Sequence, residues 1–202
     1  MITVERPLAG RMPVLDVPSR SDATILGNLL GSAIDNVPPA VRRFHASTDD
    51  VVGTGTLRVE QARSLAGRLV ARTMGMPTAA GDTLVRLSIV RESSVEHWRR
   101  HFGEEVMAST QTTDGRHLVE QIGRLELRFT VDLADQRVRF RHVATRLRIG
   151  LGYVSIPRGL SPSIAASVGA VDDRIDVAVR ITAPIVGTLL HYAGQLTPSG
   201  ST

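Results

Sequence analysis

After Pro77 the spacing of apolar residues changes from the helical period of about 3.6 to a period of two, which is typical of strands. From residue 124 to residue 133, apolar and polar residues alternate strictly in the stretch RLELRFTVDL. Because successive side chains of a strand point to opposite faces, this alternation predicts a strand with one face buried and the other in water. The same pattern returns at residues 175–181, IDVAVRI. The carboxy-terminal half is therefore predicted to be an antiparallel sheet.

Further candidate strands follow one another through short, turn-like connections such as TTDG and LADQ. In residues 137–149 the inward register begins with Val138 and Phe140 and then shifts to Val143 and Leu147. Such a shift predicts a β-bulge, and bulges bend strands where sheets curve or close. The remaining candidates are residues 83–90, 95–102, 105–110, 117–122 and 185–196. So many consecutive strands predict a strongly curved antiparallel β-sheet or a calycin-like β-barrel.

The amino-terminal part shows helical spacing instead. Residues 1–21 contain three prolines without a sustained period, and we expect a flexible arm there. Three helices are predicted. The first runs from Ser21 or Asp22 to Ile34, the second covers residues 39–46 (PAVRRFHA), and the third runs from Glu60 to Met74. Residues 161–170, SPSIAASVGA, predict at most a short helix. The expected fold class is α+β, with residues 22–200 forming a single domain.

Composition excludes several classes of function. The sequence has no cysteine and no lysine, which excludes thiolate chemistry, disulfides, Schiff bases and a phosphate-loop lysine. A net charge of +4, carried by scattered arginines, and 3% aromatic residues argue against nucleic-acid binding. No apolar run approaches the roughly 20 residues needed to span a bilayer, and Glu5 is atypical of a signal peptide. We therefore expect a cytoplasmic protein.

Familiar cofactor and metal motifs are also missing. The sequence lacks GxGxxG after a strand, a phosphate loop and a GxSxG elbow. His97 and His101 have the spacing of a helical zinc pair, but their segment is predicted to be a strand. No cofactor and no metal are expected.

Two charged residues stand at positions where the alternation of their strands would place apolar side chains. Trp98 and Phe102 flank Arg100, and Leu118 and Ile122 flank Glu120 in the same way. If both apolar faces point inward, the two charges do as well, and each then needs a partner because burying a lone charge is costly. They can form a structural ion pair, or an anion clamp and general base beside a ligand. A register in which one of them reaches solvent is the third alternative.

Other side chains are candidates for the same interior. Phe140 and His142 continue the inward register of their strand, although the bulge can turn His142 outward. Tyr153 and Tyr192 can each offer a hydroxyl to a cavity or anchor a barrel rim.

Four stretches match the pattern of a known family, and the resemblance runs from about Val37 to Leu196. They are PPAVRRFH, EHWRRHF, LVEQIG and APIVGTLLHYAGQL. The chain resembles an uncharacterised bacterial family, a domain of unknown function that also occurs fused to the carboxy-terminal end of saccharopine-dehydrogenase-like proteins. The positions that match the family's motif are Trp98, Arg100, Phe102, Ser109, Glu120, Gly123, Pro184, Gly187, Tyr192 and Gly194.

One departure from the family's pattern is that Ala170 and Val171 stand where the family tends to carry a glutamate. The family brings no established activity. Its association with a dinucleotide-binding partner suggests small-molecule metabolism by analogy.

The leading hypothesis is a barrel that binds an apolar, lipid-like or polyketide-like molecule, either as a carrier or as a cofactor-independent cyclase or isomerase. The catalytic candidates are Arg100, Glu120 and Tyr192, and the ligand-binding candidates are Trp98, Phe102, Ser109, Leu118, Phe140 and His142. The alternative is an interaction module without a cavity, whose partner is a dehydrogenase-like protein. A homodimer is also left open.

Overall fold

The computed structural model describes residues 24–199. The expected arm, residues 1–21, lies outside the described residues. The helices are α1 (Ile25–Leu30), the 3₁₀ helix η2 (Gly31–Asn36), α2 (Pro39–His45) and α3 (Leu65–Thr73). The strands are β1 (Val51–Gln61), β2 (Gly81–Glu92), β3 (Val95–Phe102), β4 (Glu105–Thr113), β5 (Leu118–Ile122), β6 (Leu125–Ala134), β7 (Arg137–Ile149), β8 (Gly152–Ser155), β9 (Ser163–Val171), β10 (Arg174–Ala183) and β11 (Gly187–Ser199).

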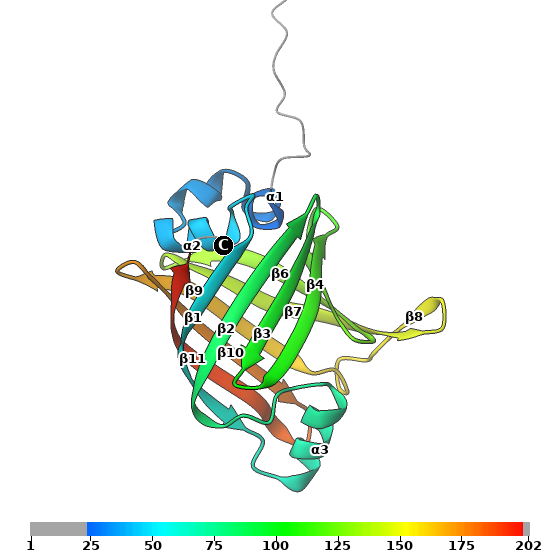
Figure 1. Ribbon diagram of the computed structural model, residues 1–202. Coiled ribbons are helices and arrows are strands. Elements are labelled where there is room, and N and C mark those ends of the chain that lie inside the picture. The colour runs from blue at the N-terminus through cyan, green and yellow to red at the C-terminus, as the bar shows by residue number, and fades with distance from the viewer. Residues whose placement is uncertain (1–23, 200–202) are drawn as a thin grey trace, which may run out of the picture.

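Ten of these strands close into an antiparallel β-barrel (Figure 1). The strand order is β6-β5-β4-β3-β2-β1-β11-β10-β9-β7, and pairing between β6 and β7 closes the ring. The strand β8 lies outside the ring, because it pairs only with the end of β7 and forms a protruding hairpin with it. The predicted barrel is confirmed, whereas the helical part of the expected α+β fold is minor.

The predicted register shift in β7 is present. Arg128 of β6 pairs with Ala144, but the next residue, Phe129, pairs with His142, so Val143 is the additional residue of a bulge. Residues 161–170 differ from the prediction, because most of them form β9 instead of a short helix. Its inward residues alternate with alanine and serine instead of charged residues, so the period of two is hard to see in the sequence.

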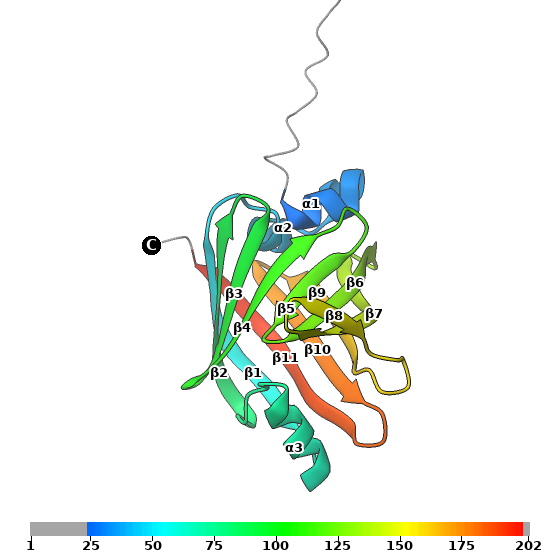
Figure 2. The same cartoon turned by 90° about the vertical axis from the view of Figure 1, so that its right-hand side faces the viewer.

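The helices lie at the two ends of the barrel (Figure 2). Helices α1 and α2 cover one end, where α1 contacts β4 and β6 and α2 contacts β9 and β10, and α3 packs against β11 near the other end. The predicted helix ending at Ile34 is shorter, because Gly31 has a φ of 53° and the chain continues as η2. The helix expected from Glu60 starts only at Leu65, after the N-cap Ser64, because β1 extends to Gln61. No helix in the described part of the chain is long and apolar enough to cross a membrane.

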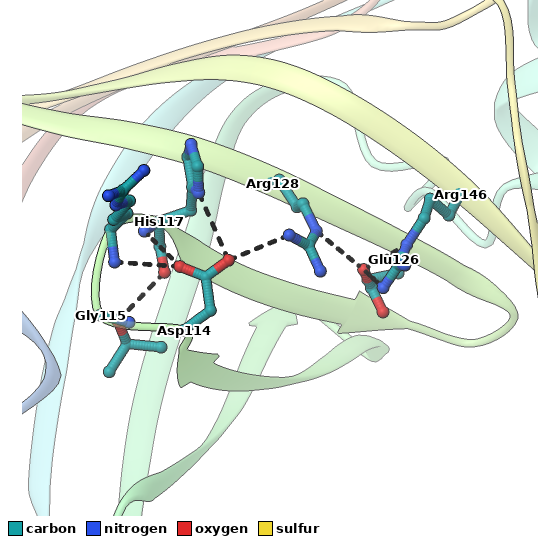
Figure 3. Close-up of polar contacts among 8 residues, drawn as sticks. Asp114, Gly115, His117, Glu126, Arg128 and Arg146 are labelled. Atoms are coloured by element: carbon teal, nitrogen blue, oxygen red, sulfur yellow. Dashed lines mark hydrogen bonds and ion pairs between the residues drawn. The ribbon is translucent and has the colours of Figure 1, made fainter.

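The outer face of β6 departs from the simple alternation. Glu126 was expected in water, yet it is buried, because Arg128 of β6 and Arg146 of β7 close over it (Figure 3). Arg128 Nε lies 3.1 Å from Glu126 Oε1, and its Nη1 reaches Asp114 Oδ2 at 3.0 Å. The ring of Tyr153 in β8 covers Arg146, 4.9 Å from its Cζ. The ion pairs, together with this cation–π contact, therefore link the β4–β5 turn to the β8 hairpin across the outside of the barrel.

Candidate functional site

The interior of the barrel contains a cavity of about 120 Å³. Every one of the ten barrel strands contributes a lining side chain, and α2 contributes Phe44 and His45 at one end. The wall of the cavity that β9 and β10 form is apolar, and its lining side chains include Ile164, Val168 and Val177. The polar members are His45, Arg100, Gln111, Glu120 and Tyr192.

Arg100 and Glu120 meet inside this cavity. Arg100 Nη2 donates to Glu120 Oε1 at 3.1 Å, and each side chain is 11% exposed. Ser109 completes a triangle, because its hydroxyl donates to the same oxygen at 2.6 Å and accepts from Arg100 Nη1 at 2.9 Å. Three adjacent strands, β3, β4 and β5, supply the three residues. No described residue donates a hydrogen bond to Glu120 Oε2.

Aromatic rings surround the ion pair. The guanidinium carbon of Arg100 lies 4.9 Å from the ring centroid of Trp98, a distance suited to a cation–π contact. The rings of Phe102 and Tyr192 meet edge to face with centroids 5.4 Å apart. Burial raises the pKa of Tyr192, so its hydroxyl keeps its proton and can donate or accept a hydrogen bond.

The other sequence candidates are placed differently. Leu118 and Phe140 line the cavity, whereas Ser109 and His142 do not. His142 instead contacts Thr145 Oγ1 through Nε2 at 2.8 Å, and its ring packs edge to face on Phe129. Among residues 24–199, no group of three or more histidine, aspartate and glutamate side chains is arranged to hold a metal ion.

A second buried ion pair was missed by the sequence analysis. Arg91 of β2 and Glu96 of β3 are 6% and 7% exposed, with Nε and Oε1 3.3 Å apart. Glu96 also accepts a hydrogen bond from the Trp98 indole at 3.0 Å. Arg91 donates to the carbonyl oxygens of Phe44, at 2.7 Å, and Asp49. This pair therefore ties the end of α2 to the rim of the barrel.

Two uncharged polar side chains were also missed. His45 and Gln111 are each 7% exposed and line both the main cavity and a second cavity of about 10 Å³ beneath α1. The His45 ring lies 5.4 Å from the Trp98 ring and 6.4 Å from that of Phe140, centroid to centroid. Burial and the charges of Arg91 and Arg100 lower the pKa of His45 to about 3. His45 is therefore a neutral imidazole.

This depressed pKa predicts sensitivity to acid. The unfolded chain takes up a proton on His45 near pH 6.5 while the folded protein does not, so stability falls as pH drops from 6.5 towards 3. Between pH 7 and pH 5 we expect His45 to lower the free energy of unfolding by about 2 kcal/mol. Urea denaturation of wild type and His45→Phe at both pH values measures this, because the variant lacks the titrating group. Equal pH dependence in the two proteins would contradict the prediction.

Comparison with known proteins identifies one family. A family model described as "Domain of unknown function (DUF4166)" matches residues 37–196, which include the Arg100–Glu120 pair, Ser109 and Tyr192. No curated protein and no solved structure matches the chain. The match agrees with the resemblance to an uncharacterised domain, while the fusion to saccharopine-dehydrogenase-like proteins and the bacterial origin stay predictions.

Proposed function

Because the chain belongs to the DUF4166 family, whose description assigns no activity, we propose from the site itself that the barrel binds a small, mostly apolar molecule. The observation that carries this proposal is the Arg100–Glu120 pair inside an otherwise largely apolar cavity. Such a combination is typical of ligand sites, where apolar walls provide affinity and a few polar groups fix orientation. The polar end of the molecule would face Arg100 and Trp98.

The size of the cavity limits the molecule. An engineered protein cavity of about 150 Å³ admits benzene. The 120 Å³ in this barrel therefore suits a single ring or a short chain, such as a small lipid-like or polyketide-like metabolite of the cytoplasm.

An enzymatic version of this proposal gives each polar group a role. Glu120 Oε2, which receives no hydrogen bond from the described residues, would take a proton from the ligand as a general base. Arg100 would stabilise negative charge that develops on a ligand oxygen, and the Tyr192 hydroxyl would donate a hydrogen bond. Such a site would support a cofactor-independent isomerisation or cyclisation. In a carrier, the same groups would only hold the ligand.

One observation favours a different function, that of an interaction module. The β7–β8 hairpin and the loop after it carry exposed apolar side chains, including Leu151, Val154 and Leu160. Exposed apolar patches often mark protein contacts. In this version the barrel would bind a dehydrogenase-like protein, or a second copy of itself, through the hairpin and would need no ligand.

A matched pair of variants tests ligand binding. Ala166 of β9 lines the cavity, whereas its neighbour Ala165 is exposed on the opposite face. We expect benzyl alcohol to change the fluorescence of Trp98, the only tryptophan, in wild type and in Ala165→Phe. Ala166→Phe fills the cavity and should weaken binding by roughly tenfold or more, since overpacking excludes the ring. Native mass spectrometry of the purified protein should also reveal a bound metabolite.

The alternatives give different results. Unchanged Trp98 fluorescence with the probe, together with an apo mass, would reject ligand binding and favour the interaction module. Once a reaction is found, Glu120→Gln separates catalyst from carrier, because a catalyst loses turnover but keeps its ligand.

A further inference from the structure

Three polar side chains of the cavity have no hydrogen-bond partner among the described residues. They are the imidazole of His45, the amide of Gln111 and the hydroxyl of Tyr192. All three residues are more than nine-tenths buried. Leaving a buried polar group without a partner costs about 1–3 kcal/mol, so such groups in a cavity are expected to meet a ligand or water.

The charged groups of the interior are already balanced. Arg91 pairs with Glu96, and Arg100 pairs with Glu120. Arg91 also donates to two backbone carbonyls, and the second terminal nitrogen of Arg100 donates to the Ser109 hydroxyl. The interior therefore carries no net charge to offset the charge of an anion or a cation.

The three unpartnered groups are themselves uncharged. Burial and the neighbouring arginines keep His45 neutral by lowering its pKa, and burial keeps the Tyr192 hydroxyl protonated by raising its pKa. A neutral imidazole offers one donor and one acceptor, an amide offers both, and a phenol can do either. Together they match a ligand group that both donates and accepts hydrogen bonds.

Resting on the proposed function, we infer that the ligand is an uncharged molecule with a hydroxyl group, held by His45 and Gln111, and that carboxylates are disfavoured. His45 from α2 and Gln111 from β4 line the boundary between the two cavities. Gln111 is also paired across the sheet with Glu96 on one side and Glu120 on the other, so it lies between the two ion pairs. The polar group would sit at this end, and the apolar body would lie against β9 and β10.

Three probes of matched shape test this inference at pH 7.5. They are benzyl alcohol, benzoate and toluene, titrated against the full chain with Trp98 fluorescence and calorimetry as readouts. The alcohol should bind more tightly than the carboxylate by roughly tenfold or more, because an anion must lose its hydration without gaining a free positive partner. It should also bind more tightly than the hydrocarbon by about fivefold, the worth of one neutral hydrogen bond.

Variants locate the polar contact. Gln111→Met and His45→Phe should each reduce the preference for benzyl alcohol over toluene, because each replaces a polar partner of the hydroxyl with an apolar side chain. Gln195→Met makes the same change as Gln111→Met at a residue of β11 that does not line the cavity, and it should alter nothing.

Each outcome has a definite meaning. Tighter binding of the carboxylate, or equal binding of all three probes, would overturn the inference while leaving the proposed function intact. The wild-type comparison decides this even if a variant fails to fold. If none of the three probes binds and native mass spectrometry shows only the apo mass, the proposed function itself fails, and the inference fails with it. A bound metabolite that carries a net charge would overturn the inference alone.

Discussion

Replacement of Glu120 by alanine should lower the free energy of unfolding by about 3–5 kcal/mol, because it leaves a buried arginine without its counterion. The Arg100 side chain is 11% exposed and would keep its hydrogen bond to the Ser109 hydroxyl and its contact with the Trp98 ring, but no negative partner. Ser109 would also lose the acceptor of its 2.6 Å hydrogen bond. Urea denaturation at pH 7 measures the loss.

The double variant Arg100→Met/Glu120→Leu is the informative control. Replacing both charges with apolar side chains removes the unpaired charge, so this variant should recover most of the lost stability. If the ion pair serves only the fold, the double variant should still bind benzyl alcohol like wild type. If it belongs to the site, a stable double variant should bind the alcohol more weakly. A loss below about 1 kcal/mol in Glu120→Ala would mean that water already screens the pair.

The strands were predictable because their signal is local. A strand with one face in the barrel must place an apolar residue at every second position, and the bounds predicted for β3 and β7 agree with the structure. The Arg100–Glu120 contact was one of the alternatives that the same logic left open, since two inward charges on nearby strands need partners. The bulge at Val143 was visible because it moves the apolar register by one residue.

His45 and Gln111 were missed for two different reasons. His45 enters the cavity only because α2 packs over the end of the barrel, against β9 and β10, which lie more than a hundred residues further along the chain. Gln111 follows the inward register of β4, but the predicted strand stopped at residue 110 and left it out. Extending that alternation from Met107 through Ser109 would have found it.

The second large loss of stability is expected at Arg91, because this side chain both pairs with Glu96 and holds the end of α2. Replacing Arg91 by methionine should lower the free energy of unfolding by about 3–5 kcal/mol at pH 7. Glu96 would stay buried without its counterion, and the carbonyl oxygens of Phe44 and Asp49 would lose their donor. Arg86→Met is the matched control on the same strand, since Arg86 is exposed, and it should change stability by less than about 0.5 kcal/mol.

The pH dependence of this loss identifies its cause. Burial raises the pKa of Glu96, while Arg91 opposes the rise, so removing Arg91 should raise that pKa further. A carboxyl whose folded pKa exceeds its unfolded value favours folding when protonated, and this contribution is lost as pH rises through the folded pKa. The Arg91→Met variant should therefore lose less stability relative to wild type at pH 5 than at pH 8. An equal loss at both pH values would assign the effect to the helix contacts of Arg91 alone, and Arg91→Met/Glu96→Gln should then be no more stable than the single variant.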